Sequence, residues 1–362
     1  MLVVFTHAGL LALSVTNHFG PTWLVPTKAV AEMGAIGVDL FFVISGCVMA
    51  LSARRFTGAG GAGTFLVLRF IRIAPLFYLA SLVMLANHIR ADLLIEPSSV
   101  LNSITFIPVF DDAVYSWPLH CLGWTLAFDF SFYLVVTASI ASGRSGRPDL
   151  LLGAMVSIPF LGFLLPLQWT AWEVLTNPLL WEFALGVAAY VIWERRWIRF
   201  LRVPIAVLAG VSVVGILVAL WLGEDWMAAS GLHAVIGQAS YATDTIEGTH
   251  SASRFLYWGV PMFLVFCTVV GFAGIGNDLW GRLLKVLGDA SYSIYLSHLF
   301  VIMLIEAAAK RMVIHPDLAM VVGLVGSAVV GIIVYRIAEK PMLRKGESGV
   351  RKWKLQHVRN QA

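Results

Sequence analysis

Eight ionisable residues that lie inside long apolar runs of the sequence, or at the ends of such runs, are candidates for chemistry. They are His7, Asp39, Arg69, Arg72, Asp129, His298, Arg336 and Glu339. A charge inside the hydrocarbon layer of a membrane costs roughly 3 kcal/mol or more, so each residue is a candidate for function. Arg69 and Arg336 are placed to extend toward the interface through their long side chains, whereas the imidazole of His7 is too short to do so.

The first candidate chemistry is proton transfer by His7. An imidazole takes up and releases protons near neutral pH, which suits a general base. A buried acid could orient the ring, as an Asp orients the His of a serine hydrolase. Asp129 and Asp39 are the candidates for that acid, and the sequence leaves open which of them reaches His7. The structural alternative is a core histidine bonded to a backbone carbonyl of a neighbouring helix.

The elements that must position these side chains are membrane-spanning helices. Of the 362 residues, 59% are hydrophobic and 13% are charged, whereas a soluble domain carries about 25% charged residues. A helix needs about 20 apolar residues to cross a bilayer. The sequence therefore predicts an all-α integral membrane protein with about ten spans, at roughly 1–16, 34–52, 65–86, 120–140, 150–166, 178–194, 203–222, 255–275, 285–308 and 318–338.

The distribution of basic residues predicts the orientation of these spans. With a cytosolic N-terminus and alternating spans, 20 of the 25 Lys and Arg residues fall on the inner side. Such an excess is typical of cytoplasmic loops, so both termini are predicted to be cytosolic. Residues 1–341 form the predicted ten-helix membrane domain. The basic tail 342–362 is predicted to contact the inner leaflet, and it does not imply a nucleic-acid partner.

Three further regions complete the topology. The stretch 97–110 is apolar but short and contains two prolines, so it is predicted to be interfacial or re-entrant. The longest connection, 223–254, is predicted to be an outer loop that could help to choose a substrate. Arg254 is counted among the basic residues of the outer side.

The cysteines and the other histidines indicate no metal site and no disulfide framework. The three cysteines, Cys47, Cys121 and Cys267, are scattered along the chain, and paired metal spacings such as H-E-x-x-H are absent. The remaining histidines are predicted to be solvated or interfacial; they are His18, His88, His120, His233, His250, His315 and His357.

Five motifs in this order give the sequence a resemblance to a known family. They are GVDLFFVISG (37–46), LRFIRIAPLFYL (68–79), WTLAFDFSFYL (124–134), LGDASYSIYLSH (287–298) and YRIAEKP (335–341). Together they resemble the acyltransferase family 3 proteins, which are multi-helix bacterial membrane acyltransferases that modify cell-envelope and secreted glycans. Any one motif is weak, but five in order on a ten-span topology are specific. The resemblance extends from residue 1 to about residue 341.

The sequence departs from the family pattern at three places. The first span of the family typically carries an Arg before its His, and that Arg would lie four residues before Met1. A helix of 16 residues is about 24 Å long, short of the roughly 30 Å hydrocarbon core, so we expect the natural start to lie upstream. The alternative is a first helix that begins inside the membrane. Asp129 replaces the usual Glu, and Cys47 replaces a Phe and is interpreted as a packing residue.

The resemblance implies a membrane-bound O-acyltransferase of the bacterial inner membrane. Such an enzyme moves an acyl group, acetyl above all, from cytosolic acyl-CoA to a hydroxyl of an extracytoplasmic glycan or glycolipid. The reaction needs a base, a positioned thioester and a group that stabilises the oxyanion. His7 is the candidate base, or alternatively a nucleophile that carries the acyl group as acyl-imidazole. Acyl-CoA is expected as a substrate, with no tightly bound cofactor.

The remaining candidate residues bind substrate or hold helices together. Arg69 and Arg72 are three residues apart on one helix face and could bind the donor's phosphates, because guanidinium pairs well with phosphate. The alternative is the ordinary excess of positive charge on the inner side. Arg336 and Glu339 have the same spacing and could pair with each other. Three more, Ser291, Tyr292 and His298, could contact the sugar, line an acyl channel or bond neighbouring helices.

Two other classes of function stay open at the level of the sequence. A secondary transporter or proton-coupled permease would also carry His, Asp and Arg within its spans. Transporters often show paired halves with broken helices, and no such internal pairing is detectable here. A non-catalytic relative that binds glycans is the second alternative, because the family Arg is missing and Asp129 stands where the family usually has a Glu.

Overall fold

The computed structural model describes residues 1–15, 22–25, 27–111, 114–165, 167, 170–229, 251–272, 279–309, 311 and 314–359. Most of the predicted outer loop 223–254 lies outside these residues. The described chain is almost entirely helical, with one two-stranded antiparallel pairing formed by β1 (Val109–Asp111) and β2 (Val114–Ser116). The predicted all-α class is therefore confirmed, with the addition of this small sheet.

The long helices follow the apolar runs of the sequence. The first half of the chain forms α1 (Leu2–Ser14), α3 (Ile36–Ala53), α4 (Gly58–Arg90), α6 (Trp124–Ala141), α7 (Pro148–Leu164) and α9 (Leu180–Glu194). The second half forms α10 (Ile198–Ala229), α14 (Val260–Phe272), α16 (Ser291–Ala309), α17 (Pro316–Val334) and α18 (Lys340–Arg359).

Shorter elements connect these helices. They are α2 (Lys28–Glu32), α5 (Pro97–Thr105), α8 (Thr170–Leu175), α13 (Ser251–Arg254) and α15 (Leu279–Asp289), with 3-10 turns at Met33–Ala35 and Cys121–Gly123. Two π-helical turns, Phe255–Gly259 and Tyr335–Glu339, lie within otherwise continuous helical segments.

Eight helical segments of the described chain are long and apolar enough to cross a membrane. Two shorter apolar helices, α1 and α7, account for the other two predicted spans. Each of the ten predicted ranges therefore contains a helix, while the number of crossings and the orientation stay predictions. One boundary differs: the predicted ninth span, 285–308, begins only at Ser291, because Ala290 separates α15 from α16.

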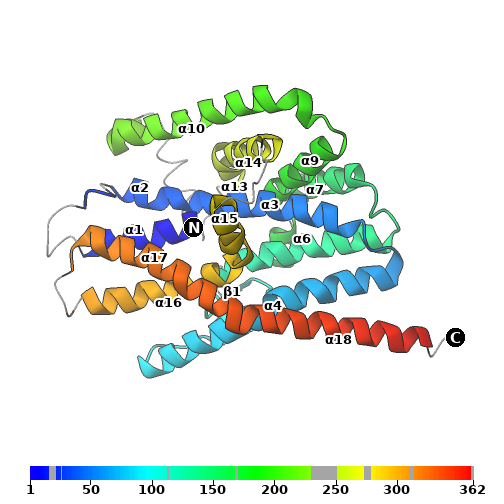
Figure 1. Ribbon diagram of the computed structural model, residues 1–362, viewed down its shortest axis with the longest axis horizontal. Helices are drawn as coiled ribbons and strands as arrows, with labels where there is room; N and C mark the ends of the chain where they lie inside the picture. Colours follow the sequence, from blue (N-terminus) through cyan, green and yellow to red (C-terminus); the bar gives the residue numbers. More distant parts are fainter. Residues whose placement is uncertain are drawn as a thin grey trace.

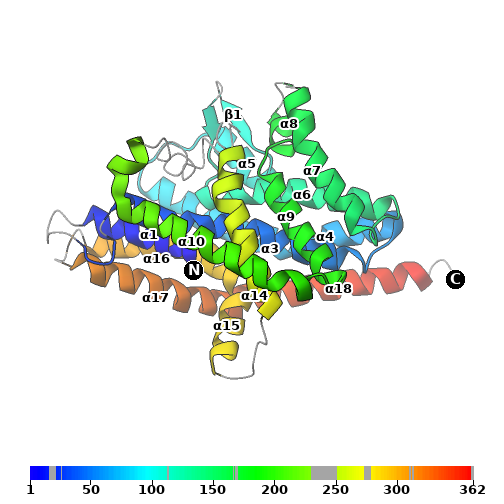
Figure 2. The same ribbon diagram turned by 90° about the horizontal axis from the view of Figure 1, so that it is seen from above.

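The helices pack in two connected groups (Figures 1 and 2). In one group α1 packs on α16 and α17, and in the other α3 packs on α9 and α6. The helix α4 packs on α6, and α14 lies between α10 and α3. The basic helix α18 continues the line of α17 and packs along α4. It extends toward the C-terminus at the right of Figure 1.

A close approach of backbones fixes the crossing of α3 and α9. A Cβ atom added to Gly46 would overlap the carbonyl oxygen of Phe183, and one added to Gly186 would overlap that of Val43. No side chain fits at either position, so glycine is required on both helices. Gly46 is the last residue of the motif at 37–46, which explains its place in that motif.

Aromatic packing beside this crossing holds α6 against the same two helices. The rings of Phe42 and Phe183 have centroids 4.7 Å apart, and those of Phe132 and Phe183 lie 4.5 Å apart. All three side chains are fully buried. Because Phe132 lies on α6, its packing fixes the rotation of the helix that carries Asp129.

The segment predicted to be interfacial or re-entrant forms α5 and β1. The buried side chain of Asn102 donates hydrogen bonds to the hydroxyl of Tyr115, at 3.1 Å, and to the carbonyl of Ser116, at 2.7 Å. Burial raises the pKa of Tyr115 to about 12, so its phenol stays neutral in this position. These bonds fasten α5 to the small sheet.

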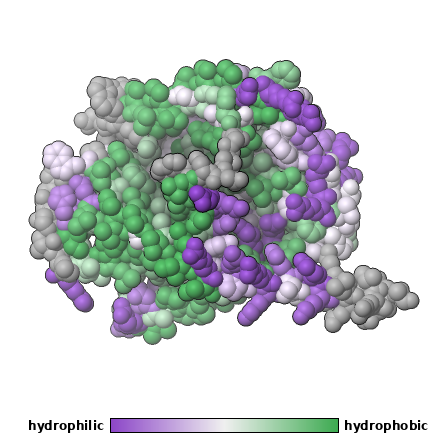
Figure 3. Space-filling view, in the orientation of Figure 1, coloured by the Kyte–Doolittle hydropathy of each residue, from purple (hydrophilic) through white to green (hydrophobic). Residues whose placement is uncertain are grey.

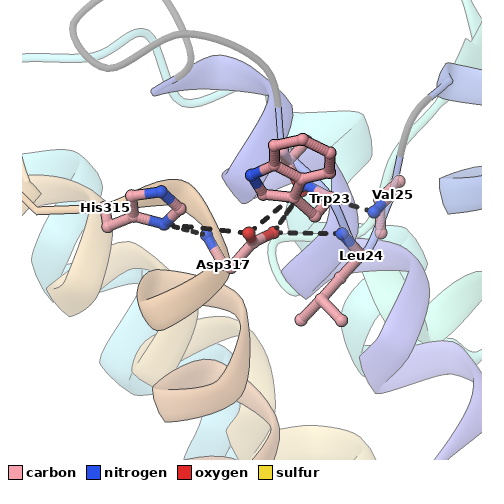
Figure 4. Close-up of polar contacts among 6 residues, drawn as sticks. Trp23, Leu24, Val25, His315 and Asp317 are labelled. Carbon is pink, nitrogen blue, oxygen red and sulfur yellow. Dashed lines mark hydrogen bonds and ion pairs between the residues drawn. The ribbon is translucent and has the colours of Figure 1, made fainter.

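A carboxylate at the start of α17 holds the segment that follows α1 (Figure 4). Asp317 accepts hydrogen bonds from the hydroxyl of Thr22 at 2.5 Å and from the backbone N–H groups of Trp23 and Leu24, each at 3.1 Å. Residues 22–24 are thus tied to the start of α17. Hydrophobic side chains cover the left and upper parts of the face in Figure 3, and hydrophilic ones gather at the right and lower centre.

Candidate active site

A cavity of about 670 Å³ lies among α1, α3, α4, α6 and α16. Its α1 wall consists of residues 1–4, and apolar side chains make up most of the remaining lining. The polar groups that face it include Ser45, Arg69, Arg72, Asp129, Tyr133 and Tyr295. The volume falls within the range of about 300–1,000 Å³ that is typical of small-molecule sites.

Both predicted donor-binding arginines line this cavity. The guanidinium of Arg69 donates to the hydroxyl of Ser52 at 2.7 Å and lies 5.2 Å from the centre of the Phe65 ring. Its Nε–H is buried and has no acceptor in the described chain. Arg72 is exposed at the cavity, and no side chain of the described residues bonds it. The spacing of three residues does bring both groups to one site, with donor capacity left over.

Asp129 also faces the cavity, from α6. It is fully buried, and neither of its carboxylate oxygens accepts a hydrogen bond of ordinary geometry within the described residues. Ser45 and Arg69 are near enough to act on it electrostatically or by a weak bond. Asp129 is thus placed beside the predicted donor-binding arginine, and no described bond joins it to His7.

Asp39, the second acid that the sequence offered as a partner for His7, is bound to Arg254. Its two oxygens accept hydrogen bonds from Nε and Nη2 of Arg254, both at 2.9 Å. The two side chains are 0% and 2% exposed, so the pair is fully enclosed by the bundle. The buried carboxyl of Glu182 lies close enough to interact with both. The structure therefore pairs Asp39 with Arg254, and no described bond joins Asp39 to His7.

The partner of His7 is a second histidine. Nδ1 of His7 lies 3.2 Å from Nε2 of His298 and 3.0 Å from the carbonyl oxygen of Val3. The ring centroids are 5.0 Å apart. His298 is fully buried, and its own Nδ1 lies 2.6 Å from the carbonyl oxygen of Tyr295. His7 lies one helical turn beyond the α1 residues that line the cavity.

Two tyrosines on α16, the predicted candidate Tyr292 and the neighbouring Tyr295, bond this helix to the rest of the bundle. The hydroxyl of Tyr295 lies 3.0 Å from that of Thr125 and donates to the carbonyl of Leu122 at 3.1 Å. Tyr292 donates to the carbonyl of Ile73 at 2.8 Å and lines the cavity. Ser291 is exposed at the cavity. These contacts fix α16 against α6 and α4, so the helix–helix alternative holds for Tyr292, which also faces the cavity.

The predicted pair of Arg336 and Glu339 does not form. Glu339 is buried and accepts a hydrogen bond from Ser293 at 2.5 Å, whereas Arg336 is exposed. The reason lies in the π-helical turn Tyr335–Glu339, which contains both residues. In a π-turn the hydrogen bonds join residues five apart, so a spacing of three no longer places two side chains over one another.

Several buried polar residues are missed by reasoning from the sequence alone. His120, predicted to be interfacial, is fully buried and donates from Nε2 to the carbonyl of Leu296 at 2.9 Å. The sequence pattern places Arg254 in an outer loop. Glu182 lies inside the predicted span 178–194, so the cost of a charge within the membrane is the signal that indicates it. The signal that could have indicated Arg254 is its position directly before the apolar run 255–275. Among the described residues, no group of His, Cys, Asp and Glu could hold a metal ion.

The fold and the site define a multi-pass helical membrane protein. Its half-buried His7 and fully buried His298 form a pair one helical turn from a cavity lined by arginine, aromatic and aliphatic side chains. Residues 1–336 match the family described as Acyltransferase domain, which is most of the chain. The chain belongs to this family and is a membrane-bound acyltransferase.

A curated relative supports the same assignment. The chain is 29% identical over 322 residues to the exopolysaccharide production protein ExoZ of Rhizobium meliloti (strain 1021). The alignment covers 87% of this chain and 92% of the relative. No solved structure matches the chain.

Proposed function

We propose that this protein transfers an acyl group, acetyl above all, from cytosolic acyl-CoA to a hydroxyl of an extracytoplasmic glycan. The name of the relative concerns exopolysaccharide production, so an exopolysaccharide or its lipid-linked precursor is the acceptor that we propose. The location would be the bacterial inner membrane, with both termini in the cytosol. Acyl-CoA serves as a substrate in this proposal, and no bound cofactor is required.

The observation that carries the proposal is the cavity, which has the arginine pair on one wall and the helical turn that precedes His7 on another. Arg69 and Arg72 line it from α4, and Val3 and Val4 line it from α1. Guanidinium groups suit the phosphates of coenzyme A through paired, charge-assisted hydrogen bonds. The largely apolar lining between these walls suits the pantetheine arm, which would extend from the arginines toward His7.

The donor's thioester would then lie near the imidazole of His7. In the base route, Nε2 of His7 takes the proton from the acceptor hydroxyl, the hydroxyl oxygen forms a bond to the thioester carbon, and the carbon–sulfur bond breaks. The proton then passes to the thiolate and gives free coenzyme A. In the carrier route, Nε2 itself attacks the thioester carbon, and the carbon–sulfur bond breaks to release coenzyme A as the thiolate. In a second step the acceptor hydroxyl displaces the acyl group from the ring, and its proton passes to the thiolate.

Asp129 has a supporting part in this proposal. Its carboxylate lies in the cavity wall near Arg69. Within the described residues, neither carboxylate oxygen accepts a hydrogen bond of ordinary geometry. An acid in this position would orient the guanidinium of Arg69 toward the donor. Asp129 would therefore act at the donor site, whereas the sequence alone suggested a role beside His7.

Acyl transfer in inverted membrane vesicles tests the proposal. Vesicles receive labelled acetyl-CoA on their outside and carry a glycolipid acceptor inside, and the label in the glycan fraction is measured. His7→Ala should abolish transfer, while His88→Ala should not. His88 is a matched control, because its Nδ1 makes the same bond to the carbonyl four residues earlier, at 2.9 Å from Met84, outside the cavity lining.

The result that would contradict the proposal is equally defined. Equal transfer by wild type and His7→Ala would remove His7 from the chemistry. Uptake of a labelled solute without any acyl donor would favour the transporter class. Binding of the glycan with no transfer, across a panel of acceptors, would favour a non-catalytic relative.

A further inference from the structure

The hydrogen bonds around His298 determine which of its nitrogens carries the proton. Its Nδ1 lies 2.6 Å from the carbonyl oxygen of Tyr295, and a carbonyl can only accept a hydrogen bond. Nδ1 of His298 is therefore the donor. In the neutral ring, Nε2 of His298 then carries a lone pair and can only accept.

This assignment fixes the state of His7 in turn. Nδ1 of His7 lies between two acceptors, namely Nε2 of His298 at 3.2 Å and the carbonyl of Val3 at 3.0 Å. Nδ1 must supply the proton for both contacts. The lone pair of the neutral His7 ring consequently lies on Nε2, the atom that faces away from the pair.

We infer that His298 is a positioning residue, which holds His7 with its Nε2 unprotonated and stabilises the imidazolium that forms when Nε2 takes up a proton. The inference rests on the proposed function for its catalytic meaning. When His7 becomes charged, its Nδ1–H bond to His298 becomes charge-assisted, and such bonds are about twice as strong as neutral ones. His298 thus takes the part that an Asp has in a serine hydrolase.

The surroundings of the pair support this role. Tyr295, whose carbonyl orients His298, is itself bonded to Thr125 and Leu122, so the second ring is held from α6. No carboxylate bonds either ring in the described chain. Asp39 is engaged by Arg254, and Asp129 belongs to the donor side of the cavity.

Two substitutions separate a positioning role from a purely structural one. In His298→Gln the amide oxygen can still accept the proton of His7, whereas His298→Leu removes the acceptor. We expect His298→Leu to lower kcat by at least about tenfold, a part of the roughly 10²–10⁴-fold that a general base supplies, with KM for acetyl-CoA unchanged. His298→Gln should recover most of this loss. Equal losses in both variants, or a change in KM alone, would overturn the inference.

Nitrogen-15 solid-state NMR of ring-labelled protein provides a readout that does not depend on activity. The signals of His7 are identified by their loss in His7→Ala, and the unprotonated nitrogen should be Nε2. His298→Leu should reduce this preference, while His120→Leu, which removes another buried ring bonded to α16, should leave it unchanged. An unprotonated Nδ1 in the wild type would refute the inference. If wild-type vesicles transfer no label, the proposed function fails, and the NMR result still decides the role of His298.

Discussion

Replacing Arg254 by Gln should destabilise the protein more than any substitution at its surface. The guanidinium and the carboxylate of Asp39 are 2% and 0% exposed and share two hydrogen bonds of 2.9 Å. Removing one partner of such a buried pair costs about 3–5 kcal/mol, because the other charge is left without compensation. The equilibrium constant for unfolding should therefore rise by about two to four orders of magnitude.

The assay is reversible unfolding of the purified protein in mixed micelles, followed by tryptophan fluorescence as the SDS fraction increases. Arg54→Gln is the matched control, because Arg54 is an exposed arginine that also pairs with a carboxylate, that of Glu194. Its loss should have little effect. In the double variant Asp39→Asn, Arg254→Gln, the carboxylate charge of Asp39 is removed together with its partner, and part of the stability should return.

Either of two outcomes would refute the reasoning behind this prediction. If Arg254→Gln unfolds at the same SDS fraction as Arg54→Gln, the enclosed pair does not stabilise the bundle. If the double variant is as unstable as the sum of the two single variants, the two residues are not coupled. Either result would mean that the helices α3 and α13 are held together by packing alone.

Three further substitutions test other parts of the structure. Gly46→Ala should lower the midpoint of thermal unfolding because its Cβ would overlap the backbone of α9, whereas Gly63→Ala, which meets no atom within 4 Å, should not; equal midpoints would contradict this. Arg72→Gln should raise KM for acetyl-CoA by about 10- to 150-fold, the equivalent of one charge-assisted bond of about 1.5–3 kcal/mol, and Arg90→Gln at the far end of the same helix should leave KM unchanged. Asp317→Ala should release the segment after α1, so limited proteolysis should cut there faster; an unchanged cleavage rate would refute that anchor.

The helices of this protein can be predicted from its sequence, because each depends on a continuous run of apolar residues. An apolar run long enough to span a bilayer can satisfy its backbone only as a helix, so all ten predicted ranges contain one. The Arg69 and Arg72 spacing is equally local, since residues three apart on an α-helix share a face. Arg69 and Arg72 therefore both face the cavity, as their spacing predicts.

The pairing of polar groups across the bundle joins residues far apart in the chain, so it could not be predicted from local sequence patterns. The partners in the buried ion pair are 215 residues apart in the chain, and the two histidines are 291 apart. Their contacts depend on which helices pack together and on how each is rotated. For α3, α6 and α9, the close approach at Gly46 and the ring packing of Phe42, Phe132 and Phe183 determine that rotation, and neither feature is visible as a periodic pattern in the sequence.

One local rule failed because the local geometry is unusual. The spacing of Arg336 and Glu339 predicts a pair on an α-helix, but both residues belong to a π-turn. The exposed arginine is left at the surface, and the buried acid finds Ser293 on α16. A sequence carries little information about single π-turns, so spacing arguments need the structure at such places.

The choice of a second histidine beside His7 follows from the cost of burying charge. A carboxylate in this position would need its own compensation within the bundle, as Asp39 needs the guanidinium of Arg254. A neutral imidazole accepts the same hydrogen bond without bringing a charge into the apolar interior. Two neutral rings can form this bond without placing any charge inside the bundle. In the reaction that we propose, the imidazolium that forms at His7 would then be the only new charge of the pair, and His298 would stabilise it through the hydrogen bond at Nδ1.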